Sequence, residues 1–186
     1  MKYLIMSDIH GSSFYLNKVL ENAKGRYDRI IILGDVLYHG PRNDLPYGYA
    51  PKECIAILNP LKDIITCVRG NCDAEVDQMV LSFLIQDSYY FNHNNKTIYC
   101  SHGHHLDFDN LKSYKPDICL YGHLHRASAW RMEDIVFINP GSVLQPRGEV
   151  MEKLYALVTV TDTTIKVDFY TRNHELYPQL SQEFTR

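Results

Sequence analysis

The chain has 186 residues, of which 45% are hydrophobic, and its formal net charge is -3. This length predicts a single domain over residues 1–186. The chain has no run of Lys or Arg and no stretch near the roughly 18 apolar residues of a membrane span, so we expect a small-molecule partner, no nucleic acid and no membrane.

Short apolar runs, each stopped by polar or glycine residues, are expected to form strands, several of them buried on both faces. In chain order they are residues 3–6, 30–33, 64–68, 97–100, 118–121 and 135–138. Amphipathic stretches of helical period lie between the first three runs, at residues 14–23 after Ser12 and Ser13, and at residues 55–58 after Pro51. This alternation of strand and helix predicts βαβ units with parallel strands.

The C-terminal part has a different pattern. Residues 153–160 and 164–170 alternate in polarity across a short D-T-T link, which predicts an antiparallel hairpin. The fold class is therefore α/β, either with one mixed sheet or with two sheets packed face to face and helices outside. The loop at residues 39–51 is the one long irregular insertion.

Side chains that commonly bind metals follow five of the apolar runs. In chain order they are Asp8 and His10, then Asp35, Asn71, His102, and finally His123 and His125. Ligands bind outside the carboxyl ends of strands in open α/β sheets, so we expect these side chains to meet in one crevice. Each motif alone has an ordinary explanation, such as a helix cap or a turn. The coincidence of five strand ends favours a metal site.

The motifs D-I-H (8–10), G-D (34–35), G-N-C-D (70–73), H-G-H (102–104) and G-H-L-H (122–125) resemble those of the calcineurin-like metallophosphoesterases. Segments 33–51, 68–79 and 139–143 are also similar to the small bacterial YfcE-type phosphodiesterases. The resemblance runs from Met1 to about Val143. It implies a four-layer α/β-β-α sandwich with mixed sheets and outer helices, and two divalent metal ions in the crevice.

The resemblance also implies how the ligands share the two metals, with Asp35 bridging them. The other six divide evenly: Asp8, His10 and His125 on the first metal, and Asn71, His102 and His123 on the second. The implied reaction is hydrolysis of a small phosphodiester by a metal-bridging hydroxide. Oxygen and imidazole donors without a thiolate suit Mn²⁺, Fe²⁺, Co²⁺, Ni²⁺ or Zn²⁺. Mn²⁺ is the metal we expect.

Cys72 stands where many relatives carry a histidine that is taken to protonate or steady the leaving oxygen. We interpret the leaving-group acid as missing or weak, so substrates with good leaving groups are expected. The alternative is a thiol ligand or nucleophile, because a cysteine beside cations loses its proton more readily. Since Cys72 directly follows Asn71, we expect its side chain to point away from the metals.

His104 is assigned to the substrate or leaving-group side of the site. For His104 and for His39 the alternative is an ordinary loop histidine. Arg42 and Arg69 either meet a phosphate or pair with nearby acids such as Asp44. The sequence does not separate these alternatives.

Two other functions remain open. A phosphomonoesterase or nucleotide pyrophosphatase would share the metal chemistry and differ in its pocket. A non-catalytic binding scaffold, like the retromer subunit of this fold, would be marked by loss of ligand residues. All seven ligand positions match here, which favours a metal-dependent phosphodiesterase.

Assembly and location are predicted from composition. Fourteen tyrosines and the loop LPYGYAP favour a homo-oligomer, because aromatic residues are enriched at interfaces. The alternative is that Tyr47 and Tyr49 pack onto the chain's own body. Five cysteines, an odd number, without a signal-peptide pattern indicate reduced thiols and a cytoplasmic protein.

Overall fold

The computed structural model describes residues 1–107, 111 and 113–185, and the strands in this part form two sheets. The larger sheet contains β1 (Lys2–Met6), β2 (Arg29–Ile32), β3 (Ile65–Val68), β4 (Ile85–Gln86), β10 (Leu154–Val160), β11 (Thr164–Thr171) and β12 (Gln182–Thr185). The smaller sheet contains β5 (Ser88–His93), β6 (Lys96–Ser101), β7 (Ile118–Leu120), β8 (Ser128–Met132) and β9 (Ile135–Asn139). The helices are α1 (Ser13–Asn22), α2 (Pro51–Leu58), the 3₁₀ helix η1 (Asn59–Ile64) and α3 (Glu75–Val80).

Both sheets are mixed. The larger sheet has the order β12-β11-β10-β1-β2-β3-β4, with β1 to β4 parallel and β10 antiparallel to β1. The smaller sheet has the order β5-β6-β7-β9-β8, with β6, β7 and β9 parallel and antiparallel strands at both edges. The α/β prediction with mixed sheets is confirmed, and so is the antiparallel hairpin, which is β10 with β11.

Several of the predicted strands are apolar at nearly every position because both of their faces are covered. Along β1, Leu4 and Met6 pack under the helices, whereas Tyr3 and Ile5 pack against the smaller sheet. Successive strand residues point to opposite faces, so a strand between two cores needs apolar residues at every position. A third cluster, which includes Phe137, lies on the far side of the smaller sheet and is joined there by Leu106 and Leu111.

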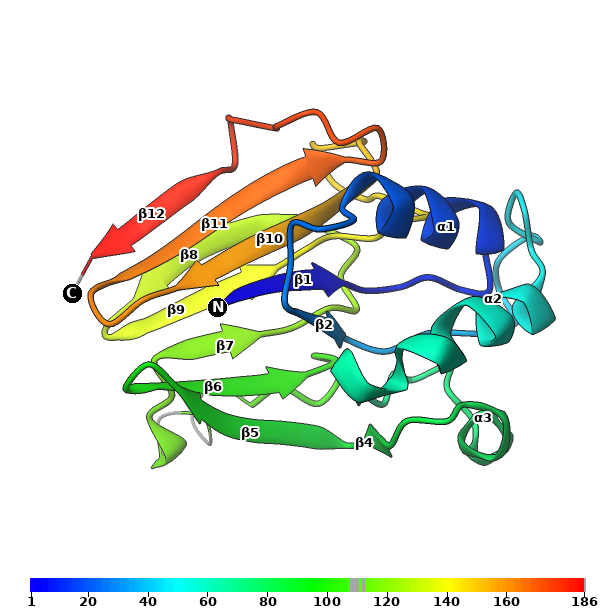
Figure 1. Cartoon of the computed structure of the whole chain (residues 1–186), viewed down its shortest axis with the longest axis horizontal. Coiled ribbons are helices and arrows are strands. Elements are labelled where there is room, and N and C mark those ends of the chain that lie inside the picture. The colour runs from blue at the N-terminus through cyan, green and yellow to red at the C-terminus, as the bar shows by residue number, and fades with distance from the viewer. Residues whose placement is uncertain (108–110, 112, 186) are drawn as a thin grey trace.

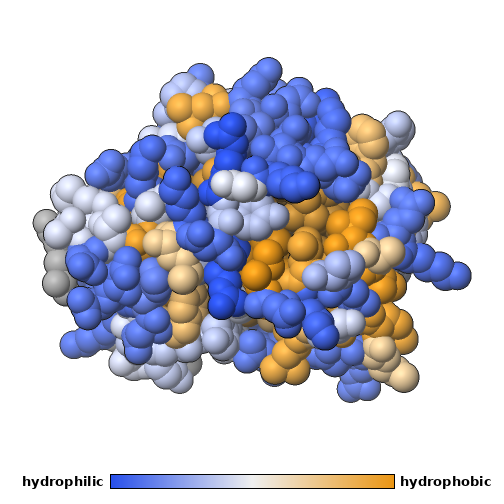
Figure 2. Space-filling model, in the orientation of Figure 1, coloured by the Kyte–Doolittle hydropathy of each residue, from blue (hydrophilic) through white to orange (hydrophobic). Residues whose placement is uncertain are grey.

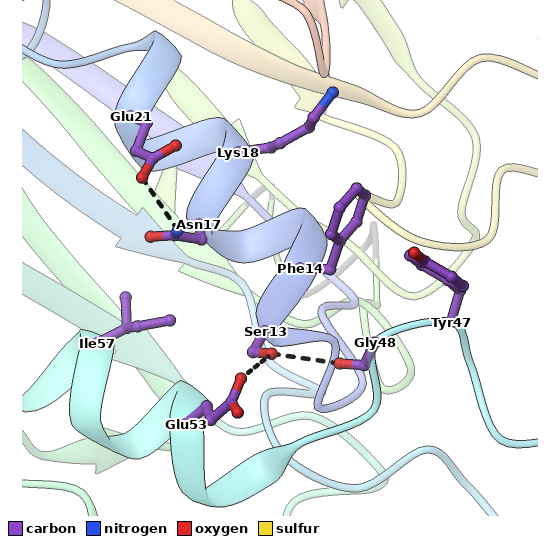
Figure 3. A pocket seen from close by; sticks show the side chains of 9 residues that line it. All are labelled: Ser13, Phe14, Asn17, Lys18, Glu21, Tyr47, Gly48, Glu53 and Ile57. Atoms are coloured by element: carbon purple, nitrogen blue, oxygen red, sulfur yellow. Dashed lines mark hydrogen bonds between the residues drawn. The ribbon is translucent and has the colours of Figure 1, made fainter.

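The helices α1, α2 and α3 lie together on one side of the molecule, at the right in Figure 1. Ser12 caps α1 as predicted, and its hydroxyl accepts a hydrogen bond from the Tyr15 N–H at 3.4 Å. Ser13 Oγ donates to Glu53 Oε2 at 2.6 Å and so ties the start of α1 to the first turn of α2 (Figure 3). Part of the surface over α2 and η1 is apolar, on the face of the molecule that Figure 2 shows.

Several elements were not predicted: α3, η1, β4, β5, β8 and β12. The strand β5 is at a sheet edge and alternates between exposed and half-buried positions, so it lacks an apolar run. The helix α3 exposes Val76 and Met79, at 58% and 83%, so its apolar residues do not mark one buried face. None of the described helices is both long and apolar enough to span a membrane.

Candidate metal centre

The loops that follow the parallel strands meet at one edge of the sandwich, and the arrowheads of β1, β6 and β7 point to the same side (Figure 1). Backbone hydrogen bonds join these loops to one another. The Asp8 N–H donates to the Gly34 carbonyl at 3.1 Å, and the His10 N–H donates to the Asp35 carbonyl at 2.9 Å. The positions of the site side chains are therefore set by main-chain contacts between strands far apart in the sequence.

A crevice of about 740 Å³ opens at this edge. Its lining combines metal-ligand, cationic and small polar groups, including His10, Asp35, Asn71, Cys72, His123, His125, Arg42 and Arg147. A volume of this size lies in the range typical of small-molecule sites.

Asp8, His10 and His125 form one group of potential ligands, in which one atom of each lies within 4.8 Å of the others. His125 Nε2 is 3.1 Å from Asp8 Oδ1, and His10 Nε2 is 3.9 Å from the same oxygen. All three side chains are buried. This group matches the set implied for the first metal.

Asp35 lies between that group and the others. Its Oδ2 is 3.8 Å from His10 Nε2 and 3.4 Å from His102 Nε2. His102 Nε2 is also 3.1 Å from Asn71 Oδ1, and the His123 ring centroid is 5.1 Å from that of His102. The structure thus brings all seven predicted ligand residues together, and Asp35 lies within 4 Å of both His10 and His102.

Backbone carbonyls fix the orientation of three imidazoles. The Nδ1–H groups of His10, His102 and His125 donate to the carbonyls of Tyr38 at 2.9 Å, Leu33 at 2.6 Å and Gln145 at 2.7 Å. A carbonyl can only accept, so in the neutral ring the Nε2 lone pair faces the crevice, as it does in metal-binding histidines.

Carboxylate oxygens and imidazole lone pairs consequently face one another in a buried space. Asp8 Oδ1 and His10 Nε2 have no hydrogen-bond partner in the part of the chain that the structure describes. Burying such acceptors without a partner is costly, and a cation between them removes the cost. The donor set therefore fits divalent metal ions.

The pKa shifts show the same need for positive charge. Burial raises the pKa of Asp35, but the hydrogen bond from His102 and its charge outweigh burial and lower it to about 2. Burial lowers the pKa of His102, but the Asp35 hydrogen bond and the charges of Asp8 and Asp35 raise it to about 9. Without a metal, a proton on His102 takes the place that a cation would fill.

The ligand loops have strained backbones. Five of the ligand residues have positive φ angles between 48° and 66°: Asp8, His10, Asp35, His123 and His125. Residues other than glycine rarely adopt this region, and such strain gathers at functional sites. Gly70 lies so close to Asp35 that a Cβ there would overlap the carboxylate, so only glycine fits.

Asp73 is a positioning residue that the sequence analysis missed. Its carboxylate accepts the N–H groups of Gly70 at 2.7 Å, Asp35 at 2.8 Å and Val36 at 2.7 Å. It therefore fixes the loop after β2 to the loop after β3. The only sequence signal was its place at the end of the G-N-C-D motif.

A sixth strand end also contributes, because the loop after β9 supports the site. Asn139 Nδ2 donates to the Gly122 carbonyl at 2.9 Å, and Ser142 Oγ donates to the Asp8 carbonyl at 2.9 Å. The segment NPGSV carried a resemblance to the family, but nothing in the sequence alone gave these residues a role.

The orientation of Cys72 differs from the expectation. Its Sγ lies on the crevice, in a group with ligand atoms of His10 and Asp35 that are all within 4.8 Å of one another. Strand alternation does not apply here, because β3 ends at Val68 and the Cys72 N–H instead donates to Asp35 Oδ1 at 2.8 Å. Burial and then the Asp35 carboxylate raise the pKa of the thiol to about 12, so without a metal it stays neutral.

His104 and His39 occupy different surroundings. The His104 ring is 5.3 Å from His102 and 5.9 Å from His123, and burial and the charge of His102 lower its pKa. His104 is thus beside the ligand set. The ring of His39 instead packs edge-on against Tyr49 at 5.1 Å and is absent from the crevice lining.

The two arginines, Arg42 and Arg69, also have different surroundings. Arg42 lines the crevice, where its charge can meet a phosphate. Arg69 Nε donates to the exposed carboxylate of Asp87 at 3.3 Å, which agrees with pairing to a nearby acid.

A second hollow lies between α1 and α2, and Figure 3 shows its lining. Phe14 and Tyr47 meet there edge to face at 4.9 Å, and Asn17 donates to Glu21 at 3.1 Å. The lining contains none of the predicted metal ligands. This hollow is distinct from the crevice.

Comparisons with known proteins agree with this geometry. The model of the calcineurin-like phosphoesterase superfamily domain matches residues 1–163. Phosphodiesterase YfcE of Escherichia coli strain K12 is 42% identical over 151 residues, which are 80% of this chain and 82% of that protein. The solved structure of the E. coli phosphoesterase YfcE has a TM-score of 0.85 at 35% identity and covers 100% of this chain and 99% of its own.

More distant relatives show the same fold. The probable metallophosphoesterase YsnB of Bacillus subtilis strain 168 is 25% identical over 178 residues, 91% of this chain and 90% of that protein. Vps29 of Entamoeba histolytica, solved in complex with Zn²⁺, has a TM-score of 0.69 at 19% identity and covers 100% of this chain and 99% of its own. At that identity the likeness shows the fold alone.

The role of Asp73 is testable by the variant Asp73→Asn. The new amide group must face a backbone N–H, and losing such a half-buried charged acceptor costs about 1–3 kcal/mol of the free energy of unfolding. We expect a lower Tm and weaker retention of added Mn²⁺ in equilibrium dialysis. The control is Asp87→Asn, which changes a 94% exposed carboxylate and should leave both quantities near the parent's. Equal effects of the two variants would show that Asp73 does not position the site.

Proposed function

The chain belongs to the calcineurin-like phosphoesterase superfamily, and on that premise we propose that this phosphoric diester hydrolase uses a dinuclear metal centre to cleave small phosphodiesters. One observation supports the metal centre above all others. Buried carboxylate oxygens of Asp8 and Asp35 face imidazole nitrogens whose other ring nitrogens are held by backbone carbonyls.

The ligand assignment follows the grouping of the side chains. We assign Asp35 to both metals, with the remaining six divided between them: Asp8, His10 and His125 on one, and Asn71, His102 and His123 on the other. When bound, two divalent cations supply a bridging hydroxide at neutral pH and counter-charge for the phosphate. Asn71 contributes a neutral oxygen, which leaves its metal more electrophilic than a carboxylate would.

The protein's own groups complete the site. Arg42 and Arg147 line the crevice, and their guanidinium groups suit binding of the non-bridging phosphate oxygens. We place Cys72 and His104 on the side of the leaving oxygen. An ordinary thiol has a pKa near 8.5, so it is a weaker general acid at neutral pH than the histidine of many relatives. Good leaving groups are therefore the expected substrates.

We propose Mn²⁺ as the metal, with Zn²⁺, Fe²⁺, Co²⁺ and Ni²⁺ as alternatives that the same donors accept. Phosphomonoester or nucleotide pyrophosphate hydrolysis remains an alternative reaction at the same centre. The scaffold function is disfavoured because all seven ligand-type side chains are present and grouped. We further propose a cytoplasmic protein, in which its five free cysteines stay reduced.

Metal dependence gives the first test of this function. Chelation should abolish hydrolysis of an activated aryl phosphodiester, and added Mn²⁺ should restore it. The assay is release of the aryl alcohol, with metal content checked by elemental analysis. Undiminished hydrolysis by protein shown to be free of metal would contradict the proposal.

The bridging role of Asp35 is tested by comparing Asp35→Asn with His39→Ala. The first change removes charge from a side chain placed between two ligand groups, whereas the His39 ring packs on Tyr49 outside the crevice lining. We expect kcat/KM to fall by at least roughly 10²-fold for Asp35→Asn and by much less for His39→Ala. Comparable losses would place the centre elsewhere.

The role of Cys72 is tested by varying the leaving group. Cys72→His replaces a group of ordinary pKa about 8.5 with one of about 6.5, which is better suited to donate a proton at neutral pH. Hydrolysis of diesters with poor alkoxide leaving groups should gain up to about 10²–10⁴-fold, and activated aryl esters should change little. If the ratio of the two rates is unchanged, the missing-acid interpretation is wrong.

The variant Cys72→Ala tests the alternative that the thiol is a metal ligand. We expect it to keep its metal content and most of its activity on activated esters. A large loss of bound metal would instead make the thiol a ligand.

A homo-oligomer stays a proposal for the assembled state. Tyr47 is 70% exposed although its ring contacts Phe14, and exposed Leu45 lies in the same loop, which supports a contact surface there. Light scattering at micromolar concentration should give a mass above that of one chain. A monomer across the whole concentration range would overturn the proposal.

A further inference from the structure

An apolar pocket of about 390 Å³ adjoins the crevice on the side of α2 and α3. Its walls come from the segment after β2, from α2 and from α3. Most are hydrocarbon or aromatic side chains: Leu37, Tyr38, Tyr49, Pro51, Ile55, Ala74, Val76 and Val80, with Lys52, Cys72 and Asp77 beside them. The volume lies within the range of small-molecule sites.

The pocket and the crevice share a wall. Tyr38, Cys72 and Ala74 line both. Because Cys72 Sγ is within 4.8 Å of potential ligand atoms of His10 and Asp35, the pocket begins next to the place where phosphorus would be bound. A substituent on the phosphate therefore reaches the pocket without leaving the protein surface.

The polar groups of the pocket are few: the charged side chains of Lys52 and Asp77, the Cys72 thiol, and the hydroxyls of Tyr38 and Tyr49. Asp77 is 7% exposed, and its Oδ2 accepts the Ala74 N–H at 2.9 Å at the start of α3. Lys52 is an exposed residue of α2. The thiol of Cys72 behaves as a small hydrophobic group. What remains suits an uncharged ring or hydrocarbon.

We propose that this pocket binds the leaving group of the substrate, and that the leaving group carries an uncharged apolar ring. This inference rests on the proposed function, which assigns the leaving oxygen to the Cys72 side. Burial of the ring removes apolar surface from water and positions the scissile bond. Aryl oxides leave without much protonation, so such a leaving group needs no strong acid in the wall between crevice and pocket.

The test compares two methyl phosphodiesters whose leaving alcohols have similar acidity. One carries 2-naphthol and the other carries the compact hexafluoroisopropanol. Because intrinsic leaving-group ability is matched, the ratio of their kcat/KM values reports pocket binding. We expect the naphthyl ester to be favoured by at least about 10-fold, as is usual for filling a hydrophobic pocket.

Two pairs of variants locate the effect. Val80→Asp places a charge in the pocket, and its control Met79→Asp changes an 83% exposed neighbour on α3 that is outside the lining. Ile55→Ala enlarges the pocket, and its control Ile57→Ala changes a side chain of α2 that faces the other hollow (Figure 3). The pocket variants should reduce the ratio by about 10-fold and the controls should preserve it.

A binding measurement accompanies the rates. 2-Naphthol is titrated into protein from which the metal has been removed by a chelator, and its fluorescence reports binding. Binding should be weaker in Val80→Asp and Ile55→Ala than in the controls Met79→Asp and Ile57→Ala. Hydrolysis of both esters with a ratio near one, unaffected by the pocket variants, would overturn this inference and leave the proposed function intact. Binding of 2-naphthol without hydrolysis of either ester by Mn²⁺-loaded protein would overturn the proposed function, and with it the assignment of this pocket to a leaving group. If Val80→Asp abolishes self-association but leaves the ratio of the two kcat/KM values unchanged, the pocket binds a second copy of the chain. That result would also overturn the inference.

Discussion

The crevice depends on one electrostatic constraint, which is that buried carboxylate oxygens face the Nε2 atoms of buried imidazoles. At 3.1 Å between His125 and Asp8, and 3.4 Å between His102 and Asp35, two acceptors repel each other unless a proton or a cation lies between them. The raised pKa of His102 is the metal-free response to that repulsion. The left-handed backbone of the ligand loops shows that the fold holds these groups against their own preferences.

The rest of the fold serves to hold those loops. Parallel strands deliver their carboxyl ends to one edge, two apolar cores fix the sheets, and the Asp73 carboxylate joins the loops after β2 and β3. The two sides of the site differ in chemical character. The cationic groups Arg42 and Arg147 belong to the crevice, whereas the wall at Cys72 leads to an apolar pocket. In the function proposed above, a diester bound between them would present its charge to the arginines and its leaving group to the apolar pocket.

The sequence predicted those features that follow from burial on two faces. Runs such as 30–33 and 135–138 are apolar at every position because each strand lies between two cores, and candidate ligands follow five of these runs. Edge strands such as β5 were not predicted, because β5 alternates between exposed and half-buried positions and so has no apolar run. The orientation of Cys72 and the role of Asp73 depend on hydrogen bonds to Asp35, 37 and 38 residues away, and no local pattern encodes such contacts. The seven predicted ligand residues do lie together in the structure. That they bind metal ions stays a prediction.

Anomalous diffraction from crystals grown with Mn²⁺ tests the central claim most directly, because it locates metal independently of activity. The account predicts two peaks per chain with Asp35 between them. One peak should contact Asp8, His10 and His125, and the other should contact the second set, Asn71, His102 and His123. No peak in the crevice, or a single peak held by Cys72 Sγ with Asp35 to one side, would contradict it.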